Sequence, residues 1–155
     1  MSEEIVIYVD ADACPVKQQI ISAARDMGVK AVFVSTIDHH LDHGGGSETI
    51  HYVQLDRAFQ SVDMYIANQI RPGQLLVTQD FGLAAIALGK RAVVVSNRGE
   101  QYTSENIDYL LAVRHLNAKK RRGGGKTKGP KAMTDADRKI FLQALTNILR
   151  ILQEK

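Results

Sequence analysis

The sequence predicts a single α/β domain, a three-layer sandwich with a mainly parallel central sheet. Short apolar runs of strand length alternate with amphipathic segments of helix length, which is typical of a parallel sheet joined by right-handed helical crossovers. The strand-length runs are apolar throughout, as expected when helices cover both faces of the sheet. With 155 residues, of which 45% are hydrophobic, the chain is long enough to bury one core. Because no internal repeat is visible, we expect one domain over residues 1–155.

The strands and helices are expected where the apolar pattern changes and where Pro or Gly interrupts it. The first strand, 5–9, is a continuous apolar run, and the first helix begins near Pro15 and stops near Gly28. A polar, Gly-rich loop covers 38–49. Further strands are expected at 31–34, 51–54, 75–78 and 92–95, and further helices at 58–70, 81–88 and 104–113.

The last part of the chain is expected to contain a basic loop and a closing helix. The loop, at about 117–131, contains a triple glycine at 123–125 and is expected to be flexible. The helix, at about 134–153, begins with Thr134 and Asp137, which resemble a capping box with Asp in place of the usual Glu. Its apolar stripe predicts that it docks on the body of the domain.

Positive charge is concentrated in one segment. Residues 114–131 contain eight Lys or Arg and no Asp or Glu, which leaves twelve basic and seventeen acidic residues elsewhere. This distribution indicates a cation site in the acidic body beside a segment that binds a polyanion, although a solvated linker has the same composition. Because the segment lacks interleaved aromatic residues, its binding should be independent of base sequence and sensitive to salt. The expected phosphate contacts are Lys119, Lys120, Arg121, Arg122, Lys126, Lys128 and Lys131, together with Lys17 and Arg138.

Lys17 and Arg138 both lie near the starts of expected helices. The helix macrodipole disfavours a cation at Lys17, so a contact with substrate phosphate would explain this residue as well as solvent exposure does. Arg138 is expected either near Asp137 or facing the acidic site, and structural pairing is the default expectation.

The sequence also bears on cellular location. No apolar run approaches the roughly 18 residues that span a membrane, so we expect no membrane partner. The acidic segment 1–4 leads directly into a strand, so no signal peptide is expected. A single cysteine excludes an internal disulfide framework and fits a reducing compartment. We therefore expect a cytoplasmic protein.

Four acidic residues lie where an apolar core would disfavour them. Burying a lone carboxylate is costly, so repeated placements of this kind suggest a shared cation. Ligands of open α/β sheets bind beyond the carboxyl ends of the strands, and clustered carboxylates suit Mg²⁺ or Mn²⁺. The expected metal ligands and catalytic residues are Asp10 and Asp12 after the first strand, Asp63 within the second helix and Asp80 after the fourth strand.

Two of these acids also have a structural explanation. Asp12 could satisfy backbone donors before Pro15, and Asp80 could cap the helix that starts at residue 81. Asp63, in contrast, has apolar residues at i±3 and i±4 and no basic residue within one turn. We therefore expect Asp63 to face the core, and we interpret it as the most informative of the four.

Three stretches of the chain resemble the PIN-like nucleases. They are Asp10 after the first strand, the D-x-x-I-A stretch that starts at Asp63, and Val77-Thr-Gln-Asp80 followed two residues later by Leu-Ala. The resemblance implies a PIN-like, Rossmann-like sheet with acidic metal ligands at Asp10, Asp63 and Asp80, and Asp12 as a fourth. It also implies hydrolysis of phosphodiester bonds with Mg²⁺ or Mn²⁺, and an RNA substrate more often than DNA.

Two further motifs resemble the YaiI/YqxD family. The first is Val9-Asp-Ala-Asp-Ala-Cys-Pro-Val-Lys17, and the resemblance extends over nearly the whole chain. The second motif runs from Gly129-Pro-Lys-Ala132 through Thr134, Asp137, Arg138 and Phe141. This resemblance implies a fold rather than an activity, and it leaves the role of the second motif open.

Other interpretations of these motifs stay open. Asp10-x-Asp12 also resembles the nucleophile motif of haloacid-dehalogenase phosphatases, in which Asp10 would attack phosphorus and Asp12 would act as acid and base. A module that binds nucleic acid and holds a structural ion without turnover would show the same charges. The Asp-His-His triplet at 38–40 matches a different metal-dependent phosphoesterase class, but a polar surface loop explains it better.

Overall fold

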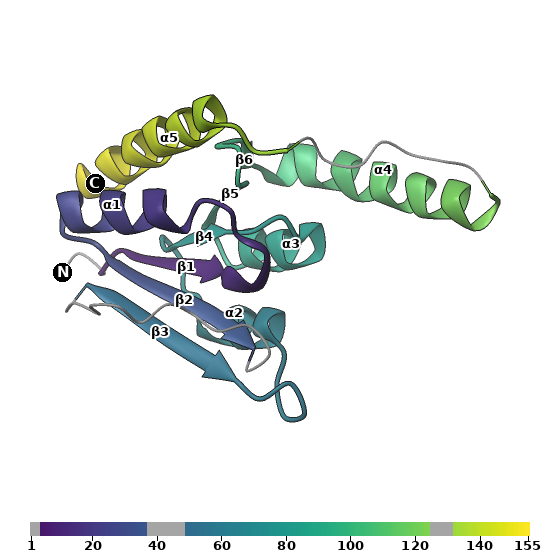
Figure 1. Cartoon of the computed structure of the whole chain (residues 1–155), viewed down its shortest axis with the longest axis horizontal. Coiled ribbons are helices and arrows are strands. Elements are labelled where there is room, and N and C mark those ends of the chain that lie inside the picture. The colour runs from purple at the N-terminus through teal and green to yellow at the C-terminus, as the bar shows by residue number, and fades with distance from the viewer. Residues whose placement is uncertain (1–3, 37–48, 125–131) are drawn as a thin grey trace.

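A mainly parallel sheet forms the centre of the molecule. The computed structural model describes residues 4–36, 49–124 and 132–155. The described strands form one six-stranded sheet in the order β3-β2-β1-β4-β5-β6, parallel except for β6, which is antiparallel to β5 (Figure 1). The prediction of a single α/β domain is therefore confirmed. The strands are β1 (Val6–Asp10), β2 (Lys30–Thr36), β3 (Ile50–Leu55), β4 (Leu75–Val77), β5 (Val93–Val95) and β6 (Gln101–Tyr102).

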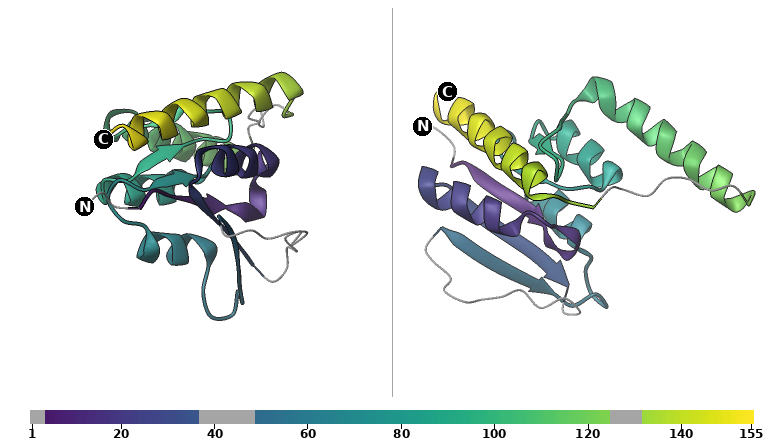
Figure 2. Two further views of the ribbon diagram at one scale, coloured as in Figure 1. Left: turned by 90° about the vertical axis from the view of Figure 1, so that its left-hand side faces the viewer. Right: turned by 45° about the horizontal axis from the view of Figure 1, so that its top comes forward.

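Helices cover both faces of this sheet (Figures 1 and 2). Adjacent residues of β1 face opposite layers, because side chains alternate along a strand. Ile7 belongs to the same apolar cluster as Phe141 of α5, whereas Val6 belongs to a second cluster with Ile66 of α2. The helices of the first layer are α1 (Lys17–Met27) and α5 (Asp135–Gln153), and those of the second are α2 (Val62–Gln69), α3 (Phe81–Gly89) and α4 (Ser104–Arg122).

The start of α2 differs from the prediction. Periodicity placed this helix at 58–70, but it begins at Val62, where Ser61 accepts a hydrogen bond from the Met64 backbone N–H at 3.4 Å. The preceding residues form a turn that ends before the helix. Because the helix starts four residues later, Phe59 lies outside it, and the Phe59 side chain is 87% exposed.

The length of α4 also differs from the prediction. The helix was expected to end near 113, but it continues to Arg122, so the basic run 119–122 is helical rather than part of a loop. Four cations in the last turn interact favourably with the helix macrodipole. Of the residues in α4, Ile107 alone is buried, and the far half of the helix projects beyond the body of the domain (Figures 1 and 2).

β6 and the start of α5 complete the fold. β6 is only two residues long, which is too short for an alternating pattern to show in the sequence. α5 begins with the capping box that was predicted: Asp137 N–H donates to Thr134 at 3.1 Å, and Thr134 N–H donates to Asp137 at 3.0 Å. Within the described ranges, no helix is long and apolar enough to cross a membrane.

Candidate active site

The candidate site lies where the strand order changes direction. Chain connections lead outward from β1 to β2 on one side and from β4 to β5 on the other, so the switch point falls between β1 and β4. At the carboxyl ends of these strands lies an open cavity of about 360 Å³. The four predicted acids all line it. The lining residues are Asp10, Asp12, Thr36, Arg57, Ser61, Val62, Asp63 and Asp80.

Asp10, like Asp12 and Asp80, is half-buried, whereas Asp63 is exposed. Asp10 Oδ2 accepts a hydrogen bond from the Thr78 hydroxyl at 3.0 Å, which connects the end of β1 to the residue after β4. Burial raises the pKa of Asp10, and the hydrogen bond from Thr78 opposes this rise. Repulsion from Asp80, Asp12 and Asp63 raises the pKa further. The four carboxylates therefore share one electrostatic environment.

Asp12 and Asp80 are held by backbone donors. Asp12 Oδ1 accepts from the Thr36 backbone N–H at 3.0 Å, at the end of β2. Asp80 Oδ1 accepts from the Leu83 backbone N–H at 3.1 Å and caps α3, as its structural explanation predicted. These bonds fix the two carboxylates at the rim of the cavity, so capping and cation binding are compatible roles.

The prediction that Asp63 faces the core is wrong. The residue is exposed, and it lies in the first turn of α2, where the helix macrodipole favours an acidic side chain. Its Oδ1 accepts from the Met64 backbone N–H at 3.0 Å. The energetic argument for Asp63 therefore fails. Asp63 still belongs to the candidate site, because the start of α2 brings this carboxylate to the same cavity as Asp10.

Two arginines at the acidic cavity were not identified from the sequence. Arg57, in the turn between β3 and α2, lines the cavity. Arg114 of α4 approaches Asp80, with 3.9 Å between its guanidinium nitrogen and the Asp80 carboxylate, and both side chains are partly exposed. Arg114 is the first cation of the basic segment, but the helix was expected to end just before it. Arg57 carries no local sequence signal.

Asn97 supports the cavity from beneath. It follows β5 and is buried, and its backbone N–H donates to the Gln79 side chain at 3.0 Å. Its side-chain amide donates to the Ala13 carbonyl at 3.4 Å. Ala13 belongs to a short 3-10 turn, Ala11–Ala13, that carries Asp12. The loops that bear Asp12 and Asp80 are thus connected through one buried residue, by its backbone N–H and its side-chain amide.

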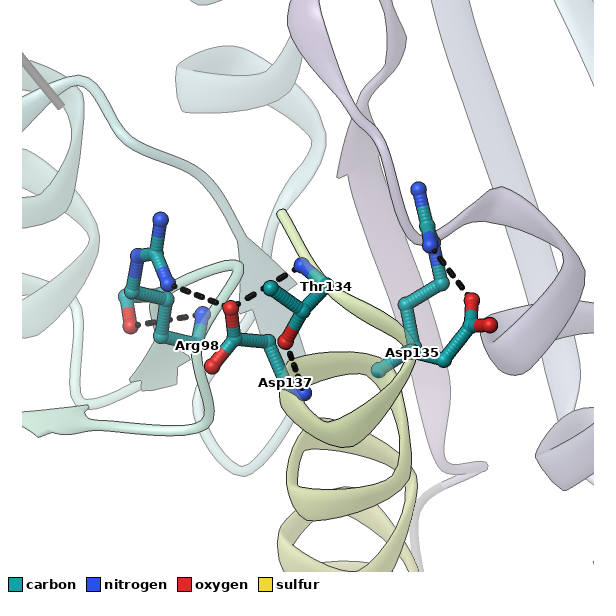
Figure 3. A network of polar contacts seen from close by, with 6 residues as sticks. Arg98, Thr134, Asp135 and Asp137 are labelled. Carbon is teal, nitrogen blue, oxygen red and sulfur yellow. Dashed lines mark hydrogen bonds and ion pairs between the residues drawn. The ribbon is translucent and has the colours of Figure 1, made fainter. Parts of the chain in front are cut away.

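Arg138 lies away from the acidic cavity. It donates to Asp135 at 2.9 Å, whereas Asp137 pairs with Arg98 at 3.0 Å (Figure 3). Structural pairing was therefore the right expectation for Arg138, but with a different partner. Its side chain lines a separate groove of about 270 Å³ that includes Gln19 of α1. Nothing in this arrangement directs Arg138 toward the four acids.

The other predicted phosphate contacts are distributed over the molecule. Lys17 is the first residue of α1 and is half-buried, and it does not line the acidic cavity. The basic run 119–122 ends α4 and is exposed. Lys126, Lys128 and Lys131 lie outside the described residues, as does the segment 38–48 of the Gly-rich loop.

The four acids have the right ligand type for a divalent cation, but they are not arranged as a preformed binding site. Carboxylate oxygens are the ligands that Mg²⁺ and Mn²⁺ prefer, and an open cavity leaves space for retained waters. Among the described residues, however, no three His, Cys, Asp or Glu side chains form a compact metal-binding group. A cation at this site would therefore have to draw the carboxylates together.

The fold and the cavity define a mainly parallel α/β protein with an acidic pocket at its switch point. The chain belongs to the YaiI/YqxD family, because the protein-family model described as "Uncharacterized BCR, YaiI/YqxD family" matches residues 8–151. Two UPF0178 proteins illustrate the similarity. One, from Halalkalibacterium halodurans, is 44% identical over 143 residues, which cover 92% of this chain and 89% of the relative. The other, from Bacillus velezensis, is 41% identical over 147 residues, which cover 95% and 86%. No solved structure matches the chain.

Proposed function

We propose that this protein is a metal-dependent nuclease of the PIN-like type that hydrolyses phosphodiester bonds, in RNA rather than DNA. The observation that carries the proposal is one cavity lined by Asp10, Asp12, Asp63 and Asp80, at the switch point of an open α/β sheet. Their mutual repulsion, together with burial, raises the pKa of Asp10. A divalent cation would offset that repulsion.

The chain's own residues supply separate parts of the chemistry. Mg²⁺ or Mn²⁺ held by the four carboxylates would supply an activated water and neutralise the leaving oxygen. The Thr78 hydroxyl donates a hydrogen bond to Asp10 and accepts one from the Asp80 backbone N–H at 3.0 Å. One side chain therefore positions two acids. Arg57 and Arg114 approach the cavity from different elements and are placed to contact phosphate oxygens.

The basic end of α4 supports a polyanionic substrate. Arg114 lies next to Asp80, and the run 119–122 continues outward along the same helix. An α-helix rises about 1.5 Å per residue, so this run begins roughly 8 Å beyond Arg114. A nucleic-acid strand at the cavity would have its neighbouring phosphates near these cations, which a small phosphomonoester would not reach.

A nucleic-acid-binding module without turnover is the second candidate. The basic last turn of α4 suits it equally, because these cations would bind a polyanion whether or not the acids support turnover. In this case the acids would hold a structural ion, and α4 would bind the polyanion.

One assay separates these functions. Labelled single-stranded RNA, single-stranded DNA and a phosphomonoester are each incubated with the protein and either Mn²⁺ or EDTA. We expect RNA cleavage with Mn²⁺ and none with EDTA. Binding without cleavage would instead favour the module, and turnover of the monoester alone would favour a phosphatase that uses Asp10 as its nucleophile.

A further inference from the structure

The turn between β3 and α2 presents an aromatic side chain to solvent. Phe59 is 87% exposed, the highest value among the exposed large hydrophobic residues that the structure describes. Met64, in the first turn of α2, is a second exposed apolar side chain at 58%. The turn lies beyond the end of β3 and protrudes from the body of the domain (Figure 1). Burial of an aromatic ring contributes strongly to folding stability, and the exposed Phe59 ring makes no such contribution.

Asp56 holds this turn in a defined conformation. Its carbonyl accepts the backbone N–H groups of Phe59 at 2.9 Å and Gln60 at 3.1 Å, and its side chain accepts the Ala58 N–H at 2.9 Å. Three hydrogen bonds to one residue fix the backbone that carries the ring. An ordered backbone loses less conformational entropy when the ring that it carries binds a ligand, which favours binding.

The same turn contributes to the acidic cavity. Arg57 and Ser61, two positions on either side of Phe59, both line it together with Asp63. A cation that can contact phosphate and an exposed ring that can contact a base therefore come from one short segment. This combination matches the two chemical parts of a nucleotide.

We propose that Phe59 stacks on an unpaired base of the strand whose phosphate lies at the acidic cavity. This inference rests on the proposed function and specifies its substrate as single-stranded at the nucleotide beside the cavity. Every base has a π-face, so the contact is independent of base identity. Bases within a duplex are already stacked on their neighbours and do not offer that face.

Tryptophan substitution makes the contact directly measurable, because the chain contains no tryptophan. The Phe59→Trp variant is titrated with a single-stranded oligonucleotide, with a blunt-ended duplex of the same length and with inorganic polyphosphate, all in EDTA so that nothing is cleaved. We expect the single strand to quench its fluorescence, with much weaker quenching by the duplex and none by polyphosphate. The matched control is Ile151→Trp on α5, which is 57% exposed on the opposite layer and should not respond.

Two further variants separate stacking from simple apolar contact. Phe59→Tyr keeps a planar ring and should bind the labelled single strand as the wild type does. Phe59→Leu keeps an apolar side chain but no ring, and should bind about tenfold more weakly, the usual scale for losing one stacked base.

Equal affinity of Phe59→Leu and the wild type, or unquenched fluorescence of Phe59→Trp while anisotropy reports strand binding, would overturn the stacking contact. Equal quenching of Phe59→Trp by duplex and single strand would overturn the selectivity for unpaired bases. Neither result bears on cleavage, which is measured separately with Mn²⁺. Quenching without cleavage would contradict the proposed nuclease function and would still support the stacking contact.

Discussion

The Thr78 hydroxyl donates to Asp10 Oδ2 at 3.0 Å across the switch point between β1 and β4. This bond joins residues that are 68 positions apart in the chain, and it lowers the pKa of a carboxylate that burial and neighbouring acids raise. Thr78 is 1% exposed, so water does not readily replace its hydroxyl. The charged state of Asp10 thus depends on this one donor.

Replacing Thr78 by Val keeps the shape of the side chain but removes both the donor to Asp10 and the acceptor of the Asp80 backbone N–H. We expect the pKa of Asp10 to rise further, so that the acidic limb of the pH profile for Mn²⁺ binding moves to higher pH. Thr78→Ser keeps the hydroxyl and should retain the wild-type profile. Calorimetric titration with Mn²⁺ at several pH values measures both, and identical profiles for Val and Ser would show that the bond does not control Asp10.

Gly99 is required where the β5–β6 turn meets α5. Its φ is +85°, and a Cβ at this position would lie 2.9 Å from the Ala144 Cβ. Gly99→Ala should therefore destabilise the protein by roughly 1–3 kcal/mol, through backbone strain and overpacking. Gly89→Ala is the matched control, because it lies in α3 with nothing within 4 Å of its added Cβ and should be neutral or stabilising. Urea denaturation would contradict this expectation if both variants unfolded at the same midpoint.

The contact between Asp137 and Arg98 anchors the start of α5 (Figure 3). Hydrogen bonds within the Thr134 capping box lower the pKa of Asp137, and Arg98 lowers it further. A depressed folded-state pKa stabilises the protein at pH values above the ordinary Asp value of 3.8, and this contribution is lost as pH falls through the folded-state pKa.

Asp137→Asn should therefore flatten the dependence of unfolding free energy on pH below about 4. Asp135→Asn is the control, because the Asp135 side chain is 95% exposed and takes no part in the capping box. Urea titrations between pH 2.5 and pH 5, the range around the ordinary Asp value, measure the difference. If Asp135→Asn flattened the curve as much as Asp137→Asn, the capping box would not be its source.

The basic end of α4 should determine the salt dependence of nucleic-acid binding. Replacing Lys119, Lys120, Arg121 and Arg122 by Gln removes four charges and keeps good helix formers. The slope of log affinity against log salt should fall in magnitude by up to about 3 for a single strand, since each phosphate contact contributes about 0.7. Replacing Lys139 and Arg150 of α5 by Gln removes charge elsewhere and should leave the slope close to that of the wild type. Equal slopes for the α4 variant and the wild type would place the polyanion elsewhere.

Local signals explain which features the sequence predicted. The apolar run of β1 and the Thr134–Asp137 capping box depend on neighbours in the chain, and both could be predicted. The start of α2 could not, because Asp56 and Ser61 set it through hydrogen bonds that periodicity does not record. This error produced the wrong expectation for Asp63.

The extent of α4 was missed for a related reason. Beyond Val113 the helix has no apolar stripe facing the body, so its sequence has the composition of a solvated loop. The positions of Arg57 and Arg114 at the acidic cavity result from tertiary packing and have no local signature. Asp10, Asp12 and Asp80 could still be predicted as a group, because the strand ends of a parallel sheet meet at one edge. Asp63 lies on α2 instead, and tertiary packing brings it to the same cavity.

The most direct test of the acidic cavity compares strand cleavage by three proteins of equal folded stability. Asp10→Asn removes a charge from the cavity but keeps an acceptor for Thr78, whereas Asp26→Asn removes an exposed charge from α1. With Mn²⁺ and labelled single-stranded RNA, we expect Asp26→Asn to cleave like the wild type and Asp10→Asn to cleave about a hundredfold more slowly, the scale of losing a positioned catalytic group. Cleavage by Asp10→Asn at the wild-type rate would contradict a catalytic role for this cavity.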